Sequence, residues 1–355
     1  MGWKYAPMIA QWASNAVVSG LGAAWLDDFI IGGKDKAEFE RNKAEFLRRL
    51  KRYNIEVDDQ DLHPVTSIKA LGLELDLSGK RYRLDPAWIE KRAETLQRTA
   101  ATTGPVSYRQ LYQMFGTLIW FAHVAQIPLW EYAEAMQALS TIAKNCAGRY
   151  DDITALPDYA RPNVDKWVCD LLANPWRGRP DERPAAFDHY VFSDASTLGQ
   201  GYVEVVHETI AASAGWRRKD VEHIFLAELD ALVAAASSCA WTKQTTLFCV
   251  DNTALHYAVT NGYSKSYPAS CRLRAAFGQV RPWSCWIPTH LMLADEPSRT
   301  FTGIRPGPLS PGQMQTLAYI QQHAYGEPRT RSDSFRSLAP VPTNCAAPLE
   351  IQRAH

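Results

Sequence analysis

Four acidic residues stand where carboxylates could do chemistry: Asp194, Glu228, Asp251 and Asp295. Three of them follow apolar segments that suit β-strands, and Glu228 lies on the apolar side of a helical segment. A carboxylate on an apolar face is costly to desolvate unless a cation compensates for it. Hard oxygen ligands favour Mg²⁺ or Mn²⁺ over zinc, and two such ions about 4 Å apart support an in-line phosphoryl displacement. The four residues therefore predict a two-metal phosphoryl-transfer site.

Each residue alone also has an ordinary structural interpretation. Asp194 and Asp251 are of the type that caps a following helix, and Glu228 could be a partly exposed helix position like Asp230, two residues further on. The order and context of all four residues together make the site prediction specific.

The elements that must position these residues are short strands and amphipathic helices. The sequence predicts one domain over residues 187–300, with an α/β (α+β) fold and a mixed five-stranded sheet. The expected strands are His189–Ser193, Gly201–Val206, Ile210–Trp216, Leu247–Val250 and Trp283–Ile287, and the expected helices are Glu222–Ser237, Asn252–Val259 and Arg272–Gly278.

This ordered set resembles the RNase H domain of retroelement reverse transcriptases, whose Asp, Glu, Asp and final Asp bind two metal ions. The matching residues are Asp194, Glu228, Asp251 and Asp295, and residues 294–299 match the family's Ala-Asp-x-x-Ser-Arg tail. Met292 departs from the family, which often has Asn there. The resemblance implies a hydrolase, an endonuclease that cuts the RNA strand of an RNA–DNA hybrid and leaves 3′-hydroxyl and 5′-phosphate ends. Asp194 and Asp251 would hold metal, and Glu228 would help to place the attacking water.

The preceding part of the chain predicts two further regions. Residues 1–85 contain the pair Asp27-Asp28 between apolar stretches, an amphipathic helix over 36–53 and a hairpin over 67–84. Residues 86–174 have a helical pattern, and the Pro- and Arg-rich stretch 175–186 is typical of a linker. After the α/β domain we expect a helical extension over 301–325 and a disordered tail over 326–355.

The amino-terminal part resembles a reverse-transcriptase palm, and residues 86–174 resemble its thumb and connection. Trp25–Asp28 is similar to the Tyr-x-Asp-Asp turn, so Asp27 and Asp28 would bind metal, while Gly2 and Gln11 match the segment that contacts nucleotide and template. The Met-Gly-Trp sequence at residues 1–3 and the tail at residues 294–299 are most similar to retrotransposons of the DIRS, Ngaro and VIPER type. In that family the fingers and the first metal-binding Asp precede the position of Met1, so the resemblance implies an amino-terminal truncation within the palm.

The resemblance leaves three interpretations open for the whole chain. One is a retrotransposon-derived RNase H whose nucleotidyltransferase (DNA polymerase) activity is lost in this chain alone. Another is a catalytically inactive remnant that still binds nucleic acid. The third is a polymerase–nuclease that acts when the rest of the retroelement polyprotein supplies the missing parts.

Composition adds little about partners. The chain has 355 residues, with 38 Lys+Arg against 38 Asp+Glu, so any phosphate contact must come from local clusters. The candidate contacts with an RNA–DNA hybrid are Lys80, Arg81, Arg217, Arg218 and Lys219, and a solvated basic face is the alternative for each cluster. Seven cysteines without a CxxC pair, and no membrane-length apolar stretch, predict an intracellular protein without a membrane partner, in nucleus or cytoplasm.

Overall fold

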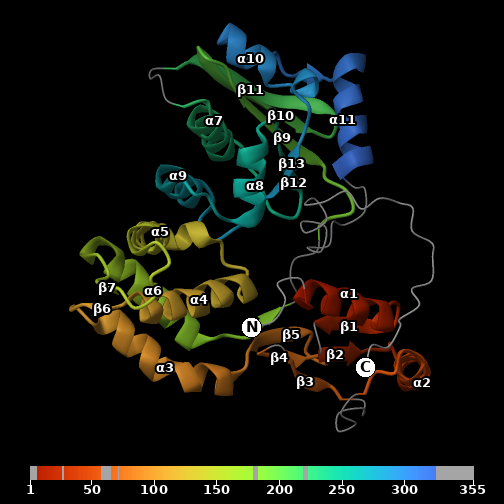
Figure 1. Cartoon of the computed structure of the whole chain (residues 1–355). Coiled ribbons are helices and arrows are strands. Elements are labelled where there is room, and N and C mark those ends of the chain that lie inside the picture. The colour runs from red at the N-terminus through yellow and green to blue at the C-terminus, as the bar shows by residue number, and fades with distance from the viewer. Residues whose placement is uncertain are drawn as a thin grey trace, which may run out of the picture. The chain divides into compact units, whose positions relative to one another are not determined.

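The computed structural model describes residues 6–25, 28–56, 65–70, 72–178, 183–218 and 223–324. The chain forms two compact units (Figure 1). The first unit takes Met1–Gln126 and Glu134–Asp181, and the second takes Ile127–Ala133 and Glu182–His355. In the part of the chain that is described, no helix is both long and apolar enough to cross a membrane.

The second unit is built on a six-stranded mixed sheet in the order β13-β12-β9-β10-β11-β14. β9 and β12 are parallel, as are β12 and β13, whereas β10 is antiparallel to both β9 and β11. Their bounds are β9 His189–Ala195, β10 Gly199–Val206, β11 Thr209–Arg217, β12 Thr246–Val250, β13 Trp283–Trp286 and β14 Gly307–Pro308.

Helices cover both faces of this sheet, because alternate residues of the central strands are apolar on each side. Val191 and Phe248 pack under the helices α7, α8 and α9, while Phe192 and Cys249 pack against α11 on the other face (Figure 1). The helical elements of this unit are η2 Leu129–Tyr132, α7 Ile224–Ser238, α8 Thr253–Asn261, α9 Tyr267–Phe277, η4 Thr289–Leu291, α10 Asp295–Thr300 and α11 Pro311–Ala324.

The predicted mixed α/β class is confirmed, with one difference in the sheet. The five expected strands are present, and the two-residue strand β14 adds a sixth by pairing with the start of β11. A Gly-Pro pair has no apolar alternation, so the strand signal that identified the other five is missing there.

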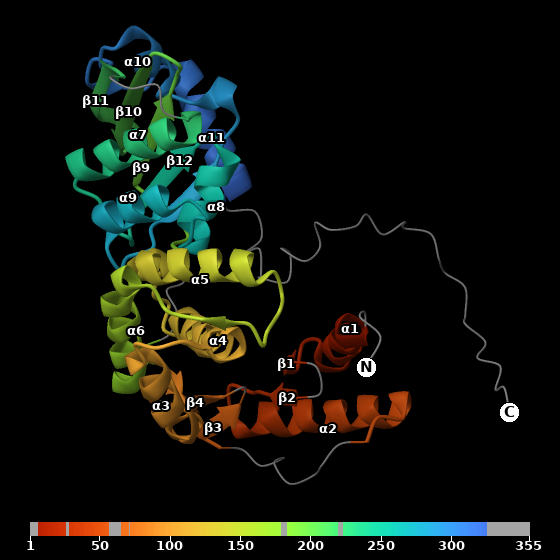
Figure 2. The same ribbon diagram turned by 60° about the vertical axis from the view of Figure 1, so that its left-hand side comes forward.

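The first unit begins with a helix, a hairpin and a second helix. β1 pairs with β2, and α1 and α2 lie beside this hairpin (Figure 2). Trp25 lies opposite Asp28 in the pair. Val17, Phe46 and Leu50 form the small core that joins both helices to the hairpin. Asp35 caps the second helix by accepting from the Glu38 backbone N–H. The bounds are α1 Ala6–Val18, β1 Gly22–Trp25, β2 Asp28–Ile31 and α2 Lys36–Tyr53.

A four-stranded antiparallel sheet and four long helices complete the first unit. The hairpin expected over 67–84 has three strands, and Arg177-Gly178, in the stretch expected to be a linker, forms the fourth by pairing with β5. The helical stretch also contains one short strand pair, β6 with β7. The bounds are β3 Ser67–Ala70, β4 Leu73–Asp76, β5 Arg81–Leu84, α3 Pro86–Ala101, β6 Val106–Ser107, α4 Tyr108–Val124, α5 Ala133–Cys146, β7 Ile153–Thr154, η3 Asp158–Ala160, α6 Arg161–Ala173 and β8 Arg177–Gly178.

Trp130 anchors a segment from the helical stretch in the core of the second unit. Its side chain is fully buried beside Phe277, and its indole N–H donates to the Gly278 carbonyl over 2.7 Å. We predict that Trp130→Ala destabilises the second unit by about 3–5 kcal/mol, because it leaves a cavity and an unpaired carbonyl. Amide hydrogen exchange of α7 and α9 should accelerate, whereas Trp12→Ala, at a 74 % exposed side chain, should leave it unchanged. Equal protection in both variants would contradict this role.

Candidate active site

The strand register of the second unit brings two of the predicted carboxylates level with each other. Phe192 of β9 lies opposite Cys249 of the parallel strand β12. Two residues further on are Asp194, near the carboxyl end of β9, and Asp251, the residue that follows β12. Because neighbouring strands lie about 4.8 Å apart, this register makes the two acids neighbours at one edge of the sheet.

Asp194 is buried, with 6 % of its surface exposed. The Ser298 hydroxyl donates to its Oδ2 atom over 2.6 Å. Burial raises the pKa of Asp194 in spite of that hydrogen bond, and repulsion from Asp251 and Asp295 raises it further. The Asp194 carboxylate therefore lies in the electrostatic field of two other acids.

Glycines in β10 and β11 allow α10 to bring Ser298 to this position. Gly201 pairs with Asp194, and a Cβ atom on Gly201 would lie 2.7 Å from both the Pro297 Cβ and the Ser298 backbone nitrogen. A Cβ atom on Gly215 would lie 2.2 Å from the Pro297 carbonyl oxygen. The absence of side chains at these two positions is thus what permits the close approach of α10 to the sheet.

Glu228 approaches the same edge from α7. The first turns of that helix are fixed to β10 because the buried Gln200 amide donates to the Ala227 carbonyl over 2.7 Å. Burial, and then repulsion from Asp251, raise the pKa of Glu228 to about 8, while a hydrogen bond from the Asn252 side chain opposes the rise and Asp194 adds to it. Glu228 is 9 % exposed, so the interpretation as a partly exposed helix position is wrong.

The capping interpretation also fails for both aspartates. The residue that caps α8 is Asn252, whose side chain accepts from the Leu255 N–H over 3.1 Å. Asp251 instead accepts a hydrogen bond at Oδ2 from the Thr289 hydroxyl over 2.8 Å. Asp194 lies inside β9 and precedes no helix.

Asp295 is the first residue of α10 and is half-buried. Arg299, one helical turn later, forms an ion pair with its Oδ1 atom at 2.6 Å. The Asp295 carboxylate also contributes to the raised pKa of Asp194. It thus adds negative charge to the site, but it already has a cationic partner.

The four carboxylates suit divalent cations chemically, because buried acids that repel one another are stabilised by added positive charge. They do not form a tight single-ion cluster. Among the described residues, the one group of three ligand atoms that lie within 4.8 Å of one another is His189, Glu204 and Cys239, not the four acids. Carboxylates that share two ions about 4 Å apart need a wider spacing than the ligands of one ion.

Several other predicted site residues lie partly or wholly outside the described chain. Gly2, Asp27 and Lys219 lie outside it. For Asp28 the structure describes the backbone alone, as the first residue of β2. Gln11 is described, and its amide donates to the Ala24 carbonyl over 2.9 Å and to Asn15. This contact ties α1 to the β1–β2 hairpin.

The basic residues predicted to contact nucleic acid differ in their contacts with the rest of this protein. Arg217 lies over the Phe301 ring, and Arg218 donates to the Ser196 carbonyl over 3.2 Å, so both lie near the α10 side of the sheet. Arg81 is held in an ion pair with Asp76 at 2.8 Å. Lys80 is exposed in the turn before β5, with a φ of 49°.

No protein-family model matches this chain, and no curated protein matches it. Among solved structures, a foamy viral protease-reverse transcriptase in complex with double-stranded DNA is similar, with 12 % identity, a TM-score of 0.37, and coverage of 80 % of this chain and 49 % of that one. The chain thus spans about half of that protein. RNase H1 from Halobacterium salinarum is 20 % identical with a TM-score of 0.27, covering 32 % of this chain and 93 % of that one.

The amino-terminal RNase H domain of rv2228c from Mycobacterium tuberculosis, solved as a fusion with maltose-binding protein, is a further similar structure. It is 14 % identical with a TM-score of 0.28, and the match covers 38 % of this chain and 99 % of that one. At these identities and TM-scores, none of the three likenesses assigns a function to this chain.

The raised pKa of Glu228 predicts how stability changes with pH in the metal-free protein. Glu228 titrates near its ordinary value of 4.5 when unfolded and at about 8 when folded, so the folded chain binds more protons between these values. Stability should therefore fall as pH rises from 4.5 to 8, by at most roughly 1.4 kcal/mol per pH unit from this group. Urea unfolding in chelator should show a weaker pH dependence for Glu228→Gln than for the wild type or Asp230→Asn. An unchanged dependence in Glu228→Gln would contradict the burial of this carboxyl.

Proposed function

We propose that the second unit is an RNase H-type endonuclease that cleaves the RNA strand of an RNA–DNA hybrid with two Mg²⁺ or Mn²⁺ ions. The observation that carries this proposal is the convergence of Asp194, Glu228 and Asp251 at one edge of the sheet, where the pKa of each of the first two is raised by burial and further by other acids of the set. The strand order and the order of the four acids along the chain also suit the RNase H resemblance.

In this proposal the protein's own residues have distinct roles. Asp194 and Asp251 would hold the ions, with Ser298 and Thr289 fixing the orientation of the two carboxylates. Bound ions would supply charge neutralisation for the developing phosphorane and a more acidic water. Glu228 would accept a hydrogen bond from the attacking water, and Asn252 would hold its carboxylate in place. Such chemistry depends on positioning and charge, and it needs no Ser or His nucleophile.

We propose a supporting role in nucleic-acid binding for the basic residues near the site. Arg217 and Arg218 lie near the end of β11, on the side where α10 packs. They would contact phosphates without reading base sequence. We also propose that the chain derives from a retrotransposon. The first unit would then have a reverse-transcriptase-type function.

A second candidate function is a catalytically inactive remnant that binds nucleic acid. The observation that favours it is the Arg299–Asp295 ion pair, since a carboxylate with a protein cation at 2.6 Å is less available to a metal ion. The two candidates differ in what they predict for metal binding and for cleavage.

Substitution of a core carboxylate tests the proposed chemistry. Asp194→Asn and Glu228→Gln should each reduce hybrid cleavage by at least ~10³-fold, because removing a group that stabilises the transition state costs several kcal/mol at about 1.4 kcal/mol per tenfold. Asp230→Asn is the matched control on the same helix, since its carboxylate pairs with Arg272 at 3.2 Å. If Asp194→Asn cleaved at the wild-type rate, the assignment would be wrong.

Metal-dependent stability separates the active from the inactive candidate. Millimolar Mg²⁺ should raise the melting temperature of the wild-type chain, because it binds the folded carboxylate cluster and not the unfolded chain. The rise should be smaller in Asp194→Asn and unchanged in Asp230→Asn. No rise in the wild type, combined with retained binding of a hybrid, would support the inactive remnant.

A further inference from the structure

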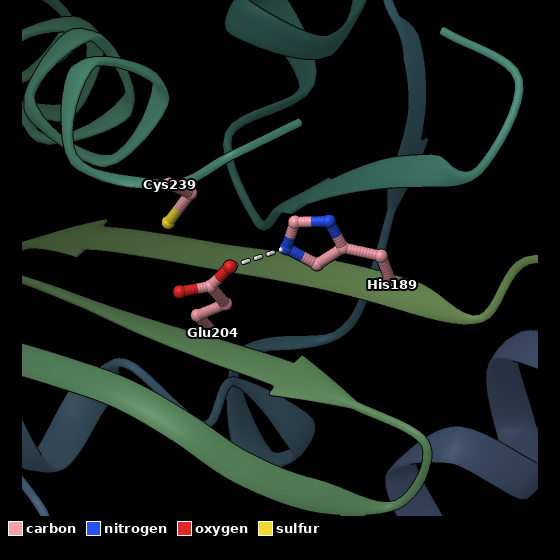
Figure 3. A group of neighbouring side chains, drawn as sticks. All are labelled: His189, Glu204 and Cys239. Atoms are coloured by element: carbon pink, nitrogen blue, oxygen red, sulfur yellow. Dashed lines mark ion pairs between the residues drawn. The ribbon is translucent and has the colours of Figure 1, made fainter. Parts of the chain in front are cut away.

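A second cluster of potential ligands lies at the other end of β9 from Asp194. His189 opens β9, Glu204 lies in β10 and Cys239 caps the carboxyl end of α7. Figure 3 shows the three side chains pointing toward one another. One ligand atom from each residue lies within 4.8 Å of the others. His189 and Asp194 are five residues apart on one strand, or roughly 17 Å, so this cluster is separate from the candidate active site.

The sheet register explains why the cluster forms on one face. His189 lies opposite Val206 in β10, and Glu204, two residues before Val206, therefore points to the same face. The side chains of His189 and Glu204 are 8 % and 13 % exposed, and Cys239 is also buried. Three polar side chains are thus held together, largely out of solvent.

The contact between His189 and Glu204 is close enough for both side chains to bind one cation. The His189 Nε2 atom lies 2.8 Å from the Glu204 Oε1 atom. Yet Nε2 is buried with no hydrogen-bond partner among the described residues, so the short distance does not have the direction of an N–H···O bond. If the ring proton is on Nδ1, the Nε2 lone pair faces the carboxylate oxygen at this separation and the two repel. A metal ion between them would relieve that repulsion, and so would a proton on Nε2.

The other ring nitrogen is already held as it is in many metal-binding histidines. His189 Nδ1 lies 3.0 Å from the Thr246 hydroxyl oxygen, and that oxygen accepts from the Thr242 backbone N–H over 3.1 Å. Since Thr246 pairs with His189 across β9 and β12, this contact is built into the sheet. A hydrogen bond at Nδ1 fixes the ring orientation and leaves Nε2 for a ligand.

We propose that His189, Glu204 and Cys239 form a binding site for one Zn²⁺-class ion. Imidazole, thiolate and carboxylate are the donor types that zinc takes, and three protein ligands leave one coordination position for a further donor. The Cys239 thiol would lose its proton to solvent on binding, which is a real cost because burial and then Glu204 raise its pKa to about 12. The ion would tie the end of α7 to β9 and β10. This inference stands independently of the proposed nuclease function.

Cobalt titration of the full chain tests the site directly. The chain is first stripped of transition metals, and millimolar Mg²⁺ is then added to occupy the carboxylate site. This sample is titrated with Co²⁺ and then with Zn²⁺. We expect one Co²⁺ per chain with a near-ultraviolet thiolate-to-cobalt charge-transfer band, and loss of that band when one equivalent of Zn²⁺ is added. Cys239→Ser should lose the band, and Cys169→Ser, at an exposed cysteine, should keep it.

A second variant covers the case in which Cys239→Ser fails to fold. Thr246→Val keeps the side-chain shape and all three ligands, and we expect it to weaken Co²⁺ binding roughly 10–100-fold through loss of the Nδ1 contact. Circular dichroism of each metal-free variant reports folding. Absence of the band in the folded wild type, or its persistence in Cys239→Ser, would overturn the proposal and leave a proton as the shared cation.

Discussion

The mutual repulsion of buried carboxylates is the constraint on which the second unit depends. Asp194 and Glu228 are both buried, and burial, followed by the charge of Asp251, raises the pKa of each. Such an arrangement lowers stability unless protons or cations neutralise it. The fold keeps it through specific contacts: Ser298 on Asp194, Thr289 on Asp251 and the Gln200 link to α7. Sites that retain strain of this kind are often functional.

The sequence predicted most of the second unit because its strands are short apolar or alternating runs and its helices are amphipathic. For Asp194 and Asp251 the sequence predicted positions at the ends of strands, and the parallel register of β9 and β12 brings these two ends together. What it could not predict was the orientation of each carboxylate. The contacts from Ser298, Thr289 and Gln200 are made across 104, 38 and 27 positions of the chain, so no local pattern indicates them.

Two other features of the second unit could not be predicted from the sequence, for different reasons. β14 has no alternation, and its pairing depends on the path of the chain after α10. The His189–Glu204–Cys239 cluster is spread over three elements without any metal-ligand spacing, so only the register of β9 with β10 and the end of α7 reveals it. The palm resemblance stays a prediction, because Asp27 and Gly2 lie outside the described residues.

We propose that the converging carboxylates make this chain a nuclease for RNA–DNA hybrids. The proposal is tested by incubating the purified chain with a hybrid labelled on each strand in turn, in Mg²⁺, in Mn²⁺ and in chelator. We expect cuts in the RNA strand alone, with 3′-hydroxyl ends, in either metal and none in chelator. A folded chain that cuts neither strand in either metal, or that cuts equally well in chelator, would contradict it.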